Sequence, residues 1–149
     1  MRKTVIAALA AVAVLGIAGY LTLGAAVQAE EVTLYKNPQC GCCEGYADYL
    51  RENGFDVTVK PTHELVPMSR AAGIPDDFQG CHLAFIDEYV VSGHVPVATV
   101  DRLLTERPDI KGITLPGMPQ GSPGMSGTKT GPFEIYAIGD GAPHLYATE

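Results

Sequence analysis

The stretch EVTLYKNPQCGCCEGYADYLRENG, residues 31–54, decides the fold that the sequence predicts. Its first five residues alternate between polar and apolar, which is typical of a half-buried strand. The next four are turn formers, and apolar residues then recur at helical spacing until an Asn-Gly pair ends the pattern. The stretch therefore predicts a strand, a turn and a helix, with Cys40, Cys42 and Cys43 at the point where the turn becomes the helix.

The rest of the chain follows from the same two periodicities. We expect strands over residues 56–60, 83–86, 89–91, 133–138 and 144–147, and helices that begin near Thr62 and Pro96. Residues 112–132 are rich in Gly, Pro, Ser, Thr and Met, so we expect a long loop there. The order β-α-β-α-β-β-α predicts a single α/β domain of thioredoxin-like type, with a Gly/Pro/Met-rich loop and a C-terminal β-hairpin added. The pattern alone also fits other two-layer α/β sheets.

Residues 1–29 have the layout of a secretory signal. Arg2 and Lys3 precede an uncharged apolar run over residues 5–29, which ends in Val-Gln-Ala. The run is longer than the usual apolar core of a signal peptide, and it is long enough for a membrane-spanning helix. Two interpretations stay open, a cleaved signal peptide or an N-terminal membrane anchor. Both place the domain of residues 30–149 outside the cytoplasm.

The net charge of that domain limits its partners. The whole chain carries a formal charge of −7, and without Arg2 and Lys3 the charge becomes −9. Nucleic acids and anionic membrane surfaces are bound by basic faces, which an acidic domain does not offer. We therefore expect no nucleic-acid partner, and contact with a membrane only through an uncleaved N-terminal segment. The charge is compatible with cation binding.

The cysteines near the predicted helix start carry the functional signal. Unpaired N–H groups and the helix dipole favour thiolates over thiols at this position. A dithiol exchanger needs two sulfurs, whereas three within one turn suit a soft ion such as copper(I). A thiol-disulfide oxidoreductase, with Cys40 as the attacking thiol and Cys43 as the resolving thiol, stays an alternative. Structural zinc or a disulfide is a third, although a second Cys-x-x-Cys pair is missing.

Cys81 lies just before the predicted third strand. In thioredoxin-like domains this region faces the Cys-x-x-Cys pair, so we expect a fourth sulfur beside the first three. The alternative is a buried apolar cysteine. His82 is the next residue in the chain, and strand alternation predicts that it points the opposite way and packs rather than binds metal.

Further candidate ligands lie later in the chain. Met118 and Met125 belong to the repeated Pro-Gly-Met motif of residues 116–126, which we call the methionine loop. Thioether sulfur is a soft donor for copper(I), although both side chains could instead pack against the domain. His94, at a predicted strand-to-helix junction, is another candidate. His63 and His144 have no spacing that argues for a site.

The conjunction of motifs resembles a known family. The segments YKNPQCGCC, GCH, GHVP and GMPQGSPGM are similar to those of the CopG-type copper-resistance proteins, and the similarity covers about residues 32–147. The resemblance implies a periplasmic thioredoxin-like protein that binds copper through Cys40, Cys42 and Cys43, with Cys81 and the methionine loop close by. It also suggests a thiol redox role in handling copper(I) and copper(II).

The sequence therefore predicts a periplasmic copper(I)-binding protein that acts in copper resistance. Its expected metal ligands are Cys40, Cys42, Cys43, Cys81, His94, Met118 and Met125. Its expected partners are copper ions and other periplasmic copper-handling proteins.

Overall fold

The computed structural model describes residues 29–149 of the chain. The predicted signal peptide or membrane anchor therefore lies outside the described residues, apart from Ala29. Within the described range, no helix is both long and apolar enough to cross a membrane.

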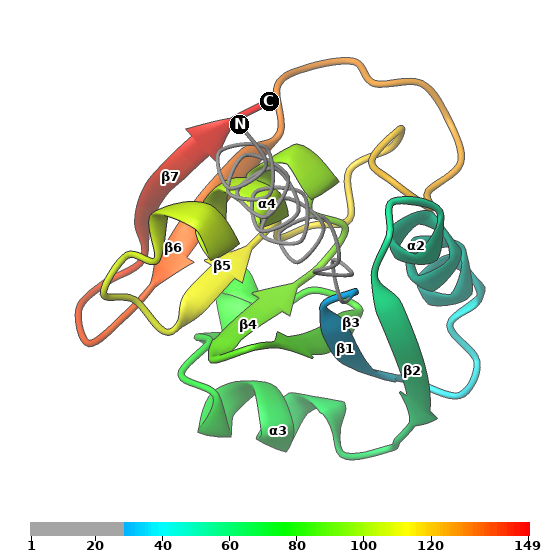
Figure 1. Cartoon of the computed structure of the whole chain (residues 1–149), viewed down its shortest axis with the longest axis horizontal. Coiled ribbons are helices and arrows are strands. Elements are labelled where there is room, and N and C mark those ends of the chain that lie inside the picture. The colour runs from blue at the N-terminus through cyan, green and yellow to red at the C-terminus, as the bar shows by residue number, and fades with distance from the viewer. Residues whose placement is uncertain (1–28) are drawn as a thin grey trace, which may run out of the picture.

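One mixed sheet organises the domain (Figure 1). Its strands are β1 (Glu31–Lys36), β2 (Asp56–Pro61), β3 (His82–Ile86), β4 (Tyr89–Ser92), β5 (Gly112–Thr114), β6 (Glu134–Ile138) and β7 (His144–Thr148). The helices are α2 (Gly41–Glu52), α3 (Leu65–Ala71) and α4 (Val97–Glu106), with a 3₁₀ turn at Asp76–Phe78. The strand order is β2-β1-β3-β4-β5-β6-β7. The predicted α/β class is confirmed, and the thioredoxin-like assignment stays a prediction.

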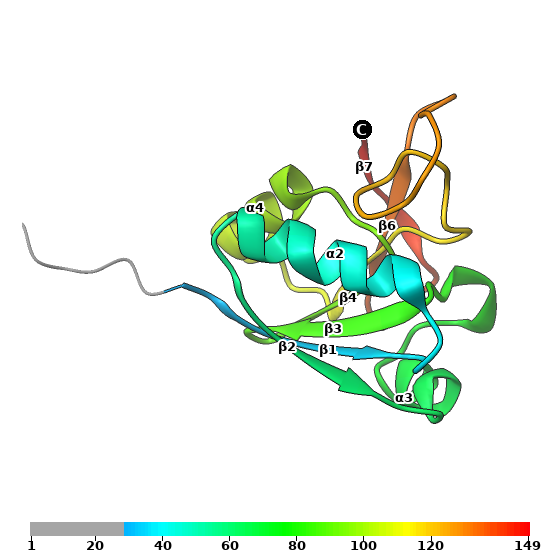
Figure 2. The same cartoon turned by 90° about the vertical axis from the view of Figure 1, so that its right-hand side faces the viewer.

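The helices cover the sheet from two sides (Figure 2). Alternate residues of the strands supply the two apolar layers, because side chains in a strand point to opposite faces. Ala84 and Val91 join the larger core under α2 and α4, and their neighbours Leu83 and Val90 join the smaller core under α3. Tyr46 anchors α2 in the larger core, where its hydroxyl donates to a backbone carbonyl 2.8 Å away.

The predicted loop over residues 112–132 is wrong at its start. Residues 112–114 form β5, which pairs in parallel with β4 and antiparallel with β6. Three residues are too few to show an alternating pattern. The strand forms because it pairs with its neighbours in the sheet, not because of the β-propensity of its own residues. The predicted C-terminal hairpin is confirmed as β6 and β7, but β5 joins it to the sheet.

Candidate metal centre

Strand register brings the two cysteine-bearing segments together. Lys36, the last residue of β1, is paired with His82, the first residue of β3. The residue before His82 therefore lies beside the turn that follows Lys36. Gly80 tightens this arrangement, because a Cβ on it would clash with the backbone of Gly93. Only glycine allows the chain before Cys81 to approach so closely.

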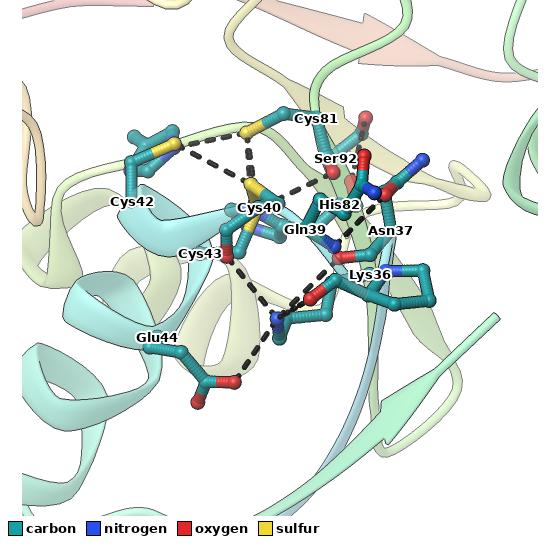
Figure 3. The surroundings of a disulfide bond; sticks show 12 residues. Lys36, Asn37, Gln39, Cys40, Cys42, Cys43, Glu44, Cys81, His82 and Ser92 are labelled. Carbon is teal, nitrogen blue, oxygen red and sulfur yellow. Dashed lines mark hydrogen bonds and ion pairs between the residues drawn. A yellow bond between two sulfur atoms is a disulfide. The ribbon is translucent and has the colours of Figure 1, made fainter.

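Four cysteine sulfurs meet at this point (Figure 3). Cys40 and Cys43 are joined by a disulfide, and Cys42 and Cys81 are free thiols. The Sγ of Cys42 lies 3.4 Å from that of Cys40, and the Sγ of Cys81 lies 3.5 Å from that of Cys43. All four sulfurs lie within 4.8 Å of one another. This four-cysteine group contains the fourth sulfur that the sequence placed beside the first three.

The helix start supplies the electrostatic setting of the group. α2 begins at Gly41, about two residues earlier than predicted, and Cys40 is its N-cap. Cys42 and Cys43 therefore lie in the first turn, where unpaired N–H groups favour negative charge on sulfur.

Lys36 is a residue of the site that the sequence analysis missed. Its side chain is buried, 3% exposed, and its ammonium donates to the carbonyl oxygen of Cys40 at 3.1 Å. Longer contacts reach the carbonyls of Asn37 and Pro38 at 3.4 and 3.5 Å, and Glu44 forms an ion pair at 3.0 Å. The lysine therefore holds the turn before the first cysteine. The alternation of the strand could have revealed its burial, because it places residue 36 on the same inward face as Val32 and Leu34.

His94 is brought to the edge of the group. Its Nε2 lies 3.0 Å from the Sγ of Cys81, and its Nδ1 lies 2.6 Å from the carbonyl oxygen of Pro123. A carbonyl can only accept, so Nδ1 carries the proton and Nε2 presents its lone pair to the thiol.

The predicted orientation of His82 is wrong. Its Nδ1 lies 3.7 Å from the Sγ of Cys81 rather than on the other side of the sheet. Alternation does not apply, because β3 begins at His82 and Cys81 lies in the bend before it. The expectation that His82 packs is met, since its ring is fully buried and stacks on Tyr46 with centroids 4.6 Å apart.

Burial sets the protonation states of these groups. Burial raises the pKa of the Cys81 thiol to about 12, and the neighbouring Cys42 adds to the shift. Burial lowers the pKa of His82 to about 3, with His94 acting in the same direction and the Gly93 backbone opposing it. Burial also lowers the pKa of His94, which its contact with the Pro123 backbone opposes. At neutral pH both imidazoles are neutral, the form in which histidine binds metal.

The methionine loop lies against α2 beside the group. The backbone of Gly124 packs on that of Tyr46, so closely that a Cβ would clash, and Met125 follows directly. Met125 is half-buried, whereas Met118 is 43% exposed. The loop is thus near the four-cysteine group, and the ligand role of the two thioethers stays a prediction. His63 and His144 are exposed and lie in neither set of donors that the described residues bring together.

Comparisons with known proteins identify relatives of this chain. The family model described as "Protein of unknown function, DUF411" matches residues 78–125. A solved structure titled copper resistance protein CopG, form 2, is 32% identical and covers 81% of this chain and 98% of its own, with a TM-score of 0.75. The chain belongs to the CopG copper-resistance family. Form 1 of the same protein, also 32% identical, covers 80% of this chain and 96% of its own, with a TM-score of 0.73. No curated protein matches the sequence.

The donor set fits the metal that the CopG family name implies. Copper binds sulfur and imidazole donors well, and four sulfurs with a neighbouring imidazole surround one small volume here. Membership of the CopG family and the four-cysteine group together fit copper binding.

Proposed function

We propose that this protein is a periplasmic copper(I)-binding protein that acts in copper resistance through its Cys-x-Cys-Cys cluster. The observation that carries the proposal is the convergence of four sulfurs, from two distant segments, within 4.8 Å. Thiolate is a soft ligand that selects copper(I) over harder ions. Cys40, Cys42, Cys43 and Cys81 would hold the ion, with His94 and the thioethers of Met118 and Met125 as further donors.

Copper-linked redox chemistry of the same sulfurs is part of the proposal. When the Cys40 and Cys43 thiols join as a disulfide, they release two electrons and two protons. That is the number of electrons needed to reduce two copper(II) ions to copper(I). Cys42 and Cys81 stay as thiols in this step and can hold the product ion, which supports a role in both binding and reduction.

A periplasmic location is supported by two features of the chain. The charged start and long apolar run of residues 1–29 suit export or anchoring. A Cys40–Cys43 disulfide also persists more readily in an oxidising compartment than in the cytosol. Other periplasmic copper-handling proteins would then donate or receive the ion.

Anaerobic titration with copper(I), in competition with a strong chelator, tests the proposal. The reduced domain of residues 30–149 should bind tightly, and Cys42→Ser should weaken binding about 100-fold because it removes a thiolate from the group. Met68→Leu, on α3 across the sheet, is the matched control and should bind like the parent. Weak copper(I) binding that is unchanged in Cys42→Ser would contradict the proposal.

A thiol-disulfide oxidoreductase is the second candidate function. The Cys40–Cys43 disulfide favours it, because these are the two cysteines that such an enzyme would use. Insulin reduction by the domain, retained in Cys42→Ser and lost in Cys40→Ser, would support this candidate. Without insulin turnover, and with tight copper(I) binding, the metal-binding function stands alone.

A further inference from the structure

Half of one sheet face has no element packed over it. Thr33, Tyr35 and Phe85 point away from the larger core, because their neighbours along each strand point into it. In Figure 2, α3 lies below the C-terminal end of β1, and no helix of residues 29–149 lies below the N-terminal end. There Phe85, paired with Thr33, is 37% exposed on an interior strand of the sheet. A partner that covered this ring would gain from its burial.

The same face already holds a cation over an aromatic ring. The Lys60 ammonium lies 5.6 Å from the centroid of Tyr35. Phe85 packs edge-to-face on Tyr35, with ring centroids 5.9 Å apart. No lysine or arginine of the described residues lies over Phe85 in the same way. Of the two adjoining rings, Phe85 is thus the one that can still accept a cation.

Acidic groups border Phe85. It lines a hollow of about 580 Å³ together with Ala29, Glu30, Glu31, Thr33 and Asp87. Asp87 is paired with Arg107, but neither Glu30 nor Glu31 forms an ion pair within residues 29–149. Glu31 also lies opposite Asp56 of β2, and like charges opposite each other on neighbouring strands are destabilising. A cation in the hollow would relieve this repulsion.

The charge of the face selects the class of partner. Without Arg2 and Lys3 the chain carries a net charge of −9, so a second copy would bring acidic groups to an acidic rim. Anionic lipid and nucleic acid are repelled for the same reason. A bare metal ion would leave the Phe85 ring uncovered. We propose that this face docks a basic segment of another protein, with an arginine or lysine over Phe85 and its charged head directed at Glu30 and Glu31.

The side chains of arginine and lysine fit both parts of the face. Their carbon stems pack on apolar surface while the charged head reaches polar groups, and guanidinium groups stack on aromatic rings. Glu31 begins β1, whereas Lys36 ends it beside Cys40 of the four-cysteine group. The docking face and that group therefore lie at opposite ends of β1, and docking does not depend on the proposed copper function.

Titration of the isotope-labelled full-length protein with a short basic peptide, followed by nuclear magnetic resonance, tests for docking. The probe is acetyl-Ser-Arg-Leu-Arg-Ser-amide. It should shift the backbone amide signals of Thr33 and Phe85 more than those of other residues, and added salt should weaken its binding. A matched probe carries citrulline, an uncharged analogue, in place of both arginines. It should bind about tenfold more weakly.

Variants of the protein test the two parts of the face separately. Phe85→Ser should weaken peptide binding about fivefold, because it removes the ring beneath the cation. Glu31→Gln should weaken it about threefold, because it removes one charge. The matched controls are Leu145→Ser, at another exposed apolar side chain of the sheet, and Asp101→Asn, at an exposed acid of α4. Both should bind like the parent protein. If circular dichroism shows that Phe85→Ser is unfolded, Glu31→Gln decides in its place.

A docking surface for basic segments is excluded if the arginine peptide does not bind. It is also excluded if the signal shifts spread over acidic residues of the whole surface, which would show non-specific charge attraction. Binding that is unchanged in both Phe85→Ser and Glu31→Gln would place the peptide elsewhere and overturn the assignment. Self-association of the protein that Phe85→Ser abolishes, measured by sedimentation, would assign the face to a second copy instead.

Discussion

The cysteine turn, residues 37–40, and the methionine loop lie against the same end of α2, yet they are held in different ways. The cysteine turn is fixed from within its own segment, because the buried ammonium of Lys36 binds its carbonyls. The methionine loop is fixed from outside, by the packing of Gly124 on α2 and the contact of Pro123 with His94. Sulfur positions in the turn therefore follow from local sequence, and those in the loop follow from tertiary contacts.

Gly124→Ala should have the largest effect on stability, because it disrupts the packing of the methionine loop on α2. Its Cβ would clash with the Tyr46 backbone, and its φ of +75° strains any L side chain. We expect a loss of about 3 kcal/mol or more in the free energy of unfolding, measured by urea denaturation. Gly117→Ala is the matched control, with φ of +77° but open space around its Cβ, and should cost about 1 kcal/mol. Equal costs for the two variants would show that the loop is not docked.

Lys36→Met tests the local contact. It removes the buried ammonium that donates to the carbonyl of Cys40 and pairs with Glu44, so we expect a loss of about 2 kcal/mol in the free energy of unfolding. Lys60→Met is the control, since that lysine is exposed and its ammonium lies over the Tyr35 ring, 5.6 Å from the centroid. It should cost less than about 1 kcal/mol. If the Lys36 variant were as stable as the Lys60 variant, the contacts of Lys36 would not stabilise the cysteine turn.

Acid should destabilise the metal-free domain through its buried histidines. The pKa of His82 is about 3 in the folded protein and near 6.5 in the unfolded chain, so the unfolded chain binds the extra proton first. The stability that His82 contributes is complete above pH 6.5 and falls as the pH drops toward 3. Between pH 7.5 and pH 5 we expect a loss of about 2 kcal/mol from His82, with His94 adding in the same direction.

Urea denaturation at a series of pH values measures this slope. His82→Gln should flatten it by up to one proton, whereas the exposed His144→Gln should leave it unchanged. A slope that is the same in both variants would show that His82 does not carry the effect.

The smallest effect expected concerns the two methionines. Met125 follows the docked Gly124 and is half-buried, whereas Met118 is exposed. Met125→Leu should therefore weaken copper(I) binding about 5–10-fold and Met118→Leu less, with little change in stability because leucine has similar volume. Chelator competition gives both values, and Met68→Leu is again the control. The reverse order would show that the exposed thioether is the better ligand.

The sequence predicts most of this site where the signals are local. The strand, turn and helix around Cys40 follow from alternation, turn residues and helical spacing, and they place three sulfurs correctly. The approach of Cys81 depends on the pairing of β1 with β3, a long-range contact that was expected from thioredoxin-like domains rather than from periodicity.

The three misses have separate physical causes. β5 has only three residues, so its pairing with β4 and β6 leaves no pattern in the sequence. The orientation of His82 depends on whether Cys81 belongs to the strand or to the bend before it, a boundary of one residue. Lys36 was missed because of its residue type. A lysine in a strand is usually exposed to solvent, although the position of this one in the alternation places it on the buried face.

The insertion of β5 also determines where the polypeptide can be shortened. Removal of all residues after Lys111 would remove β5. β4 would then become an edge strand, and the backbone amide groups around Val90 and Val91 would be unpaired. An unpaired strand edge is a template for self-association between molecules. The last quarter of the chain thus covers an edge of β4 that would otherwise be open to pairing with another molecule.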